Sequence, residues 1–317
     1  MKILLKEIAL ALIWGILIPG VILNAAVKLG RHDLDHVDEA ELIFYTQPEE
    51  DAIQIRVLRD DGTVAILELE EYIIGVVLAE MPASFEVDAL KAQAVVARTY
   101  TMRAAKGKSK HDDADVCMES TCCQAYRTQA DTSEDEAKVQ SAVLNTSGEV
   151  LTYKGELIEA TYFSCSGGST EDALAVWGTE VPYLVATESP GEEQATHYSD
   201  HVSIAPQSFL EALTLESSET PEKWFGTVTY TAGGGVDTME ICGKIFKGTE
   251  LRKLLNLRST AITIEPSTDK IIITTRGYGH RVGMSQYGAD AMALDGYSYD
   301  EILSHYYKGT ELTTLSH

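Results

Sequence analysis

The sequence has few basic residues for its length. Lys and Arg total 25 against 49 Asp and Glu in 317 residues, which gives a formal net charge of −24 at pH 7. Such a surface repels a polyanion, so the composition argues against DNA or RNA as a partner. A hydrophobic fraction of 44% and 15 tyrosines also argue against an acidic disordered chain and predict a packed globular protein.

Several sequence signatures are also missing. The chain has no HExxH-type helix, which argues against a zinc hydrolase. It has no internal repeat, and its expected strands and helices do not follow a regular β-α-β order. We therefore predict an α+β fold, in which mixed and antiparallel sheets and a few helices form two lobes around a substrate cleft.

One long apolar run stands at the N-terminus. Lys2 and Lys6 precede a nearly unbroken apolar span from Ile8 to Val27. A helical span of ~20 residues covers the hydrocarbon core of a bilayer, which favours a transmembrane anchor. The alternative is a signal peptide cleaved near Ala25-Ala26. In either case the lysines lie on the cytoplasmic side and the rest of the chain lies outside the membrane.

This pattern predicts three parts. Residues 1–30 are the membrane anchor, residues 31–50 are a polar and acidic tether, and residues 51–317 are an extracytoplasmic domain with a second lobe at about 200–270. The expected location is the cell membrane, with a single pass.

The secondary structure expected after the tether is a hairpin around Asp61-Gly62, a helix from about Pro82 to Ala105, a long loop over 107–132, a helix over 134–146, strands joined at Lys154-Gly155, a hairpin turning in the glycines at 233–235, a short helix over 249–257 and a strand pair over 261–277.

Glu80 ends the apolar run IIGVVLA and precedes Met81-Pro82. One interpretation is a solvated carboxylate near a helix N-terminus. The other is a carboxyl group partly surrounded by apolar side chains, whose pKa is raised so that it serves as a general acid. The residues around Glu80 leave both interpretations open.

A glycine-rich segment near the C-terminus, RGYGHRVGMSQYG, surrounds four polar or aromatic side chains. Glycines let a backbone approach a ligand closely, and polar side chains between them can bind one. The alternative is a tight turn with a satisfied imidazole. The candidate residues are His280, Ser285, Gln286 and Tyr287.

Three of the five cysteines fall within seven residues, in the segment HDDADVCMESTCC. His111, Cys117 and Cys123 are spaced six apart and suit Zn²⁺ in a loop, with a fourth position left for water or another group. Cys122 is a competing ligand, but as the neighbour of Cys123 it is expected to point elsewhere. A disulfide at Cys117 or free thiols are the alternatives.

Three motifs in order along residues 53–312 resemble the stage II sporulation protein D family. They are AEMPASFEVDALKAQAVVARTY, YFSCSGGSTED with VWGTEVPYL, and GYGHRVGMSQYGADAMALDGYSYDEILSHYY. The resemblance implies a membrane-anchored lytic transglycosylase that cleaves the MurNAc-GlcNAc bond of peptidoglycan to 1,6-anhydro-MurNAc products during sporulation engulfment. It also implies strands stripped of stem peptides as substrate, and a partner amidase with membrane proteins at the sporulation septum.

The resemblance also assigns roles to single residues. It implies that Glu80 is the catalytic acid and base, and that zinc lies beside the active site, as in a clostridial branch of the family. Arg98 matches the arginine of the helix motif, and we expect it to contact substrate rather than Glu80. Ser164, Ser166, His280, Ser285, Gln286 and Tyr287 are expected to line the cleft. The family commonly has glycine where Arg281 stands here.

A second function remains open from the sequence. A related amidase-enhancer group suggests a non-catalytic protein that binds the cell wall and stimulates a partner hydrolase. Anhydro-muramic ends on digested glycan strands would distinguish the enzyme from the enhancer.

Overall fold

The computed structural model describes residues 52–315, and the chain from Ile53 onward forms a compact unit of its own. The predicted anchor over 1–30 and tether over 31–50 lie outside the described residues. Among the residues described, no helix is both long enough and apolar enough to cross a membrane.

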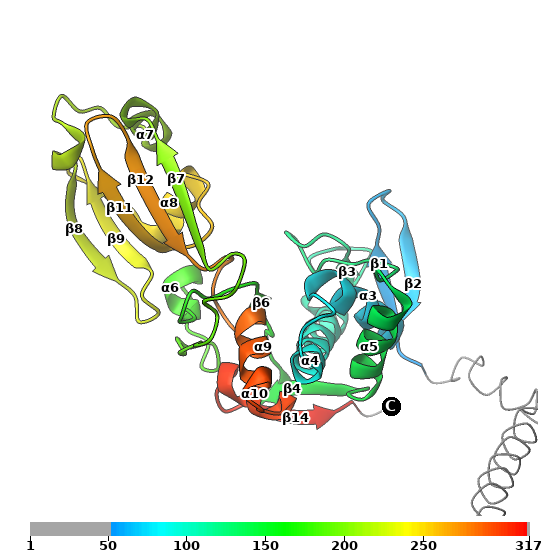
Figure 1. Ribbon diagram of the computed structural model, residues 1–317. Helices are drawn as coiled ribbons and strands as arrows, with labels where there is room; N and C mark the ends of the chain where they lie inside the picture. The colour runs from blue at the N-terminus through cyan, green and yellow to red at the C-terminus, as the bar shows by residue number, and fades with distance from the viewer. Residues whose placement is uncertain (1–51, 316–317) are drawn as a thin grey trace, which may run out of the picture. The chain divides into compact units, whose positions relative to one another are not determined.

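The fold is α+β, as predicted, and most of its strand pairs are antiparallel (Figure 1). Two pairs, β1 with β3 and β6 with β13, are parallel, so the sheets are mixed.

The strands are β1 (Gln54–Leu58), β2 (Val64–Glu68), β3 (Val116–Cys117), β4 (Glu149–Tyr153), β5 (Glu156–Leu157), β6 (Tyr162–Phe163), β7 (Ser199–Ile204), β8 (Phe225–Tyr230), β9 (Val236–Ile241), β10 (Lys244–Lys247), β11 (Ala261–Pro266), β12 (Ile271–Arg276), β13 (Met284–Ser285) and β14 (Glu311–Thr314). The helices are α3 (Leu69–Glu80), α4 (Val87–Arg103), η1 (Ala104–Lys108), α5 (Ser133–Leu144), α6 (Ala173–Trp177), α7 (Pro206–Leu213), η2 (Pro221–Lys223), α8 (Gly248–Leu254), α9 (Gln286–Leu294) and α10 (Tyr299–Tyr306).

The hairpins and short helices expected from turn signals are present. β1 and β2 pair around Asp61-Gly62, and β4 and β5 pair around Lys154-Gly155. β8 and β9 pair around the glycines at 233–235, and α5 and α8 occupy the segments expected to be helical. These signals are local, which is why the sequence was sufficient to find them.

The apolar run that ends at Glu80 is a helix, not an extension of the hairpin. It forms α3, in which seven residues are buried, so it is apolar on most of its circumference. A short run of this kind does not distinguish strand from helix by periodicity. The next helix was expected from Pro82, but residues 82–86 form turns and α4 begins at Val87. Glu80 therefore lies at the C-terminal end of one helix rather than near the N-terminus of the next.

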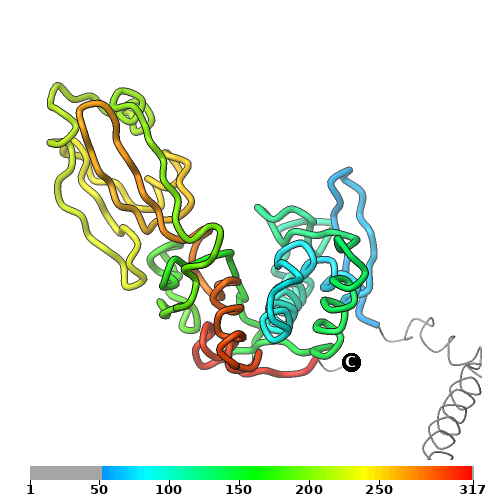
Figure 2. The backbone as a smooth tube through the Cα atoms, in the orientation of Figure 1, coloured from blue at the N-terminus to red at the C-terminus, as the bar shows by residue number. Residues whose placement is uncertain are grey.

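The first hydrophobic core is built around α4, whose residues from Ala89 to Met102 are mostly buried. α3, α5, β4, α9 and α10 pack against it, so the two ends of the described chain meet here. The C-terminal strand β14 pairs with β4, although the two strands are distant in sequence (Figure 2).

A second hydrophobic core occupies the region predicted as a second lobe. β7, β12 and β11 form one antiparallel sheet, β8, β9 and β10 form another, and α7 and α8 contribute apolar residues to the same cluster. Its largest buried side chains include Phe209, Trp224 and Phe246. Two separate cores are thus present within one compact unit.

Candidate functional site

Glu80 is partly buried at the last position of α3. The backbone N–H of Ala125 donates a hydrogen bond of 2.7 Å to Glu80 Oε1. The side chains of Tyr162 and Gln286 also hydrogen-bond to this carboxyl. Three segments that are distant in the sequence therefore converge on one carboxyl group.

Burial raises the pKa of Glu80 above its ordinary value. The hydrogen bonds from Ala125, Tyr162 and Gln286 lower it in part, because they favour the charged form. The position at a helix C-terminus acts in the same direction as burial, since the negative end of the helix dipole disfavours a carboxylate. The interpretation of Glu80 as a carboxyl in partly apolar surroundings is the one that the structure supports.

Tyr162 is a site residue that the sequence analysis did not name. Its hydroxyl donates a bond of 3.2 Å to Gln124 Oε1, and it also lies within hydrogen-bond reach of Glu80. When Glu80 is protonated, this hydroxyl can accept from the carboxyl and donate to Gln124; when Glu80 is ionised, it can turn and donate to the carboxylate. The same hydroxyl thus serves both protonation states of Glu80.

Glu80 borders two pockets. The larger has a volume of about 710 Å³ and is lined also by Tyr100, Trp177, His280 and Gln286. The smaller, about 300 Å³, shares Glu80, Ser164 and Gln286 with the first and is lined further by Phe85 and Tyr287. A long substrate could therefore lie on both sides of the carboxyl. The residues of the second core, 199–276, line neither of these pockets. We expected the substrate cleft between the two lobes, but the pockets at Glu80 are bordered by the first core.

His280 lines the larger pocket, and its ring bonds to the backbone of two residues. Nδ1 accepts from Val282 N at 3.1 Å, and the ring also bonds to the backbone of Tyr162. Burial lowers the pKa of His280 to about 4, so the imidazole is neutral near pH 7. It helps to fix Tyr162, the residue that reaches Glu80, and its ring is one wall of the pocket.

Arg98 is not a cleft residue, which corrects the expectation that it contacts substrate. Its side chain is fully buried and forms an ion pair of 2.6 Å with Glu70. The same guanidinium donates to the carbonyls of Glu149 and Val143. Arg98, on α4, therefore joins α3, α5 and the first residue of β4.

Two predicted serines are also structural. Ser166 is fully buried, and its N–H and hydroxyl both donate to Glu192 Oε2 at 2.8 Å. Ser285 is fully buried as well and caps α9, accepting from Gly288 N. These two residues hold the loops behind the pocket, whereas Ser164, Gln286 and Tyr287 do line the pockets as expected.

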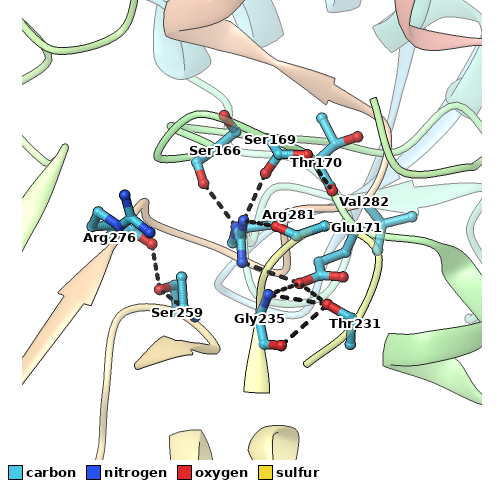
Figure 3. A network of polar contacts seen from close by, with 12 residues as sticks. Ser166, Ser169, Thr170, Glu171, Thr231, Gly235, Ser259, Arg276, Arg281 and Val282 are labelled. Carbon is cyan, nitrogen blue, oxygen red and sulfur yellow. Dashed lines mark hydrogen bonds and ion pairs between the residues drawn. The ribbon is translucent and has the colours of Figure 1, made fainter. Parts of the chain in front are cut away.

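Arg281, next to His280, lies in a left-handed conformation with φ 64° and is almost completely buried (Figure 3). It forms an ion pair of 3.1 Å with Glu171. Its other bonds run from Nε to Ser166 O at 2.7 Å, and from Nη2 to Ser169 O at 2.7 Å and to Gly233 O at 2.8 Å. Arg281 thus ties its own segment to the loop at 166–169 and to the turn between β8 and β9.

Glu171 extends this network to the β8–β9 turn. Its Oε1 accepts from Gly235 N and from Thr231 Oγ1, both at 2.9 Å (Figure 3). A Cβ at Gly235 would overlap Glu171 Oε1, so the close approach requires glycine. The buried ion pair therefore joins the second core to the segment that carries His280.

The cysteine-rich loop brings four potential metal ligands together. One ligand atom each from His111, Cys117, Cys122 and Cys123 lies within 4.8 Å of all the others. Cys122 Sγ is 3.9 Å from Cys123 Sγ and 3.7 Å from His111 Nε2. The expectation that Cys122 points elsewhere is therefore wrong, and the group is His/Cys₃ rather than a set of three.

This loop also carries partners of Glu80. Gln124 and Ala125 directly follow Cys123, and they bind Tyr162 and Glu80 respectively. Tyr126 then packs against Tyr72 and over Gly75 of α3, where a Cβ would overlap the tyrosine ring. Cys122 and Cys123 themselves line the larger pocket. The four-ligand group is thus positioned to determine where the partners of Glu80 lie.

The fold and the site define a class of protein: an α+β chain with one partly buried carboxyl in a cleft beside a His/Cys₃ group. Comparison with known sequences agrees. The family model described as "SpoIID: Stage II sporulation protein" matches residues 60–153. Stage II sporulation protein D of Bacillus subtilis (strain 168) is 37% identical over 263 residues, which cover 79% of this chain and 76% of that protein.

A second relative, stage II sporulation protein D of Bacillus amyloliquefaciens, is 36% identical over 84% of this chain and 80% of its own length. An "Amidase enhancer" of Bacillus subtilis (strain 168) is 31% identical over 76% of this chain, but the match covers 40% of that protein. The chain belongs to the stage II sporulation protein D family.

Proposed function

We propose that this protein is a lytic transglycosylase that cleaves the MurNAc-GlcNAc bond of denuded peptidoglycan strands, with Glu80 as its catalytic residue. The observation that carries the proposal is the environment of Glu80: one carboxyl at a helix end, with a pKa raised by burial, bordering two pockets. A membrane anchor over residues 1–30, an extracytoplasmic location at the sporulation septum, and a partner amidase with membrane proteins are parts of the same proposal.

The mechanism needs a single carboxyl. Ordinary glycosidases use two, one as acid and one as nucleophile or base. Here the protonated Glu80 gives its proton to the glycosidic oxygen as that bond breaks. The C6 hydroxyl of the same MurNAc closes onto C1, and Glu80, now a carboxylate, accepts the hydroxyl proton. The product is the 1,6-anhydro sugar, and Glu80 ends protonated as it began.

A digestion experiment tests this activity. The full-length chain is incubated with purified glycan strands lacking stem peptides, and the products are analysed by mass spectrometry. Anhydro-muramic ends, one water lighter than reducing ends, support the proposal. Reducing ends would instead indicate a hydrolase, in which Glu159, the other carboxyl lining the larger pocket, acts with Glu80. Uncut strands would contradict both enzymes.

The second candidate function is a non-catalytic enhancer of a partner amidase. The likeness to the amidase enhancer favours it. It predicts that the chain leaves denuded strands unchanged and raises the rate of an added cell-wall amidase, and that Glu80→Gln does not change this stimulation.

Zinc is the metal that we propose for the His/Cys₃ group. A tetrahedral zinc ion with Zn–S of about 2.3 Å and Zn–N of about 2.0–2.1 Å separates its ligand atoms by roughly 3.5–3.8 Å. Three separations fit this geometry: 3.4 Å from His111 Nε2 to Cys123 Sγ, 3.7 Å from His111 Nε2 to Cys122 Sγ, and 3.9 Å between the two sulfurs. With Cys117 included, the four ligand atoms lie within 4.8 Å of one another. Such a complete shell is typical of structural zinc, which would hold Gln124 and Ala125 against the site.

We expect Cys122→Ser and Cys123→Ser each to weaken zinc binding on the order of hundredfold or more, because each removes a ligand. Even the loss of a hydrogen-bond partner of a ligand typically lowers metal affinity by about 10–100-fold. Competition with a chromophoric chelator measures this affinity. Cys242→Ser is the control, since Cys242 belongs to the second core. A wild-type chain without stoichiometric zinc and with five titratable thiols contradicts the zinc proposal. If Cys122→Ser binds zinc as tightly as the wild type and Cys123→Ser does not, the ligands are His111, Cys117 and Cys123 only.

Tyr162→Phe should shift the pH profile of cleavage. The hydroxyl lowers the pKa of Glu80 by hydrogen bonding, so its loss raises that pKa further. Glu80 then stays protonated to higher pH, and the fall in activity on the alkaline side moves upward. Initial rates of strand cleavage across the pH range measure the shift. A movement to lower pH would show that Tyr162 does not stabilise the carboxylate.

A further inference from the structure

Two aromatic rings stand exposed in the pocket of Glu80. Trp177 at the end of α6 is 42% exposed, and Tyr278, after β12, is 43% exposed. Both line the larger pocket. An aromatic ring of this size is usually buried or paired, so two open rings in one pocket indicate a surface for a ligand.

Each ring is supported on one side by an imidazole. Trp177 and His280 have ring centroids 5.5 Å apart with planes at 54°, and Tyr278 and His197 have centroids 5.1 Å apart with planes at 67°. The guanidinium carbon of Arg258 also lies over the Tyr278 ring, 5.6 Å from its centroid. His280 is itself held by its backbone bonds and packs on Phe163. Rings held in this way lose little conformational freedom when a ligand covers them.

The chemistry of the pocket fits a sugar ring. In β-1,4-linked hexosamines the hydroxyl and acetamido groups lie around the rim, so the two faces of the ring are mainly C–H. These faces pack on the electron-rich face of an aromatic ring, while the rim requires polar partners. Ser164 and Gln286 supply such partners in the same pocket.

We propose that Trp177 and Tyr278 are stacking platforms for N-acetylhexosamine rings on the side of Glu80 that faces the cysteine-rich loop. This inference rests on the proposed glycan-cleaving function and names the residues that hold the strand. The platforms bind substrate in the ground state and the transition state alike, so they affect binding more than the chemical step.

Tryptophan fluorescence gives a direct test with tri-N-acetylchitotriose as the probe. The sequence has three tryptophans. Trp224 is 4% exposed in the second core and Trp14 precedes the described residues. We expect saturable quenching of the full-length chain by the trisaccharide, and loss of that quenching in Trp177→Phe.

Calorimetry then measures affinity. Trp177→Ala and Tyr278→Ala are each expected to weaken trisaccharide binding roughly tenfold to a hundredfold, with an increase in KM for glycan strands and little change in kcat. Trp177→Phe keeps a ring and should bind within about threefold of the wild type. Tyr230→Ala is the matched control, because Tyr230 is exposed on β8 in the second core.

The outcomes separate the platforms from the function itself. If the wild type cleaves strands and binds the trisaccharide but both alanine variants bind it equally well, the platforms are refuted and the enzyme stands. If the wild type neither binds nor cleaves, both proposals fall. If the alanine variants keep saccharide affinity but lose binding to a partner amidase, the aromatic surface is a protein-docking site and the inference is overturned.

Discussion

We expect Glu80→Gln to lower the rate of strand cleavage by roughly 10²–10⁴-fold. The expected effect is large because, in the proposed mechanism, one carboxyl serves both as the acid that protonates the leaving oxygen and as the base that accepts the C6 hydroxyl proton. Glutamine has nearly the same size and keeps hydrogen-bonding capacity toward Ala125 and Gln286, which bind Glu80 in the wild type. Release of anhydro-muramic ends, followed by mass spectrometry, measures the loss.

Glu159→Gln is the matched control for this experiment. Glu159 lines the same pocket, but it is paired with Arg103 at 3.4 Å, and its side chain is 41% exposed. A transglycosylase keeps most of its activity in this variant, whereas a two-carboxylate hydrolase loses it. Substantial cleavage by Glu80→Gln would refute Glu80 as the acid.

The raised pKa of Glu80 also predicts two pH effects. The proposed cleavage requires the protonated acid, so activity should fall as the pH rises through the raised pKa. For stability, a carboxyl whose pKa is higher in the folded than in the unfolded chain favours folding below its unfolded pKa, and this contribution is lost as the pH rises through the folded pKa. Glu80→Gln should therefore be more stable than the wild type at neutral pH, and the difference should diminish in acid. Thermal unfolding across the pH range tests the sign.

The sequence was sufficient to find what depends on local patterns. Turn residues located the hairpins, and the position of Glu80 after an apolar run gave partly apolar surroundings as one of two interpretations. The spacing of His111, Cys117 and Cys123 predicted a ligand group in the loop, and the structure brings these three together. Cys122 was named only as a competing ligand, because the side chains of adjacent residues often point in different directions. This segment is a turn in which both thiols lie near His111 Nε2.

Residues whose role depends on a distant partner could not be assigned in this way. Nothing near Arg98 indicates that Glu70, 28 positions earlier, binds its guanidinium. Alternate residues of a strand share a face, but β6 consists only of Tyr162 and Phe163, so this rule links Tyr162 to neither Ser164 nor Ser166. Tyr162 therefore had no local signal, and Ser166 binds Glu192, which lies 26 positions later.

Arg281→Met should cost about 3–5 kcal/mol of unfolding free energy, the second large effect that we expect. Arg281 and Glu171 are 2% and 1% exposed, so the substitution leaves a carboxylate buried without its cation. Three carbonyls, at Ser166, Ser169 and Gly233, lose their donor as well. Urea unfolding followed by circular dichroism measures the loss.

An exposed ion pair provides the comparison. Lys223 and Glu219 are 2.8 Å apart, but their side chains are 67% and 60% exposed, so Lys223→Met should change stability by less than about 1 kcal/mol. Arg281→Lys tests geometry separately from charge, because an ammonium cannot reach in several directions as a planar guanidinium does. It should recover only part of the loss. If Arg281→Met costs no more than Lys223→Met, the buried pair does not hold the second core to the segment that carries His280, and another contact must do so.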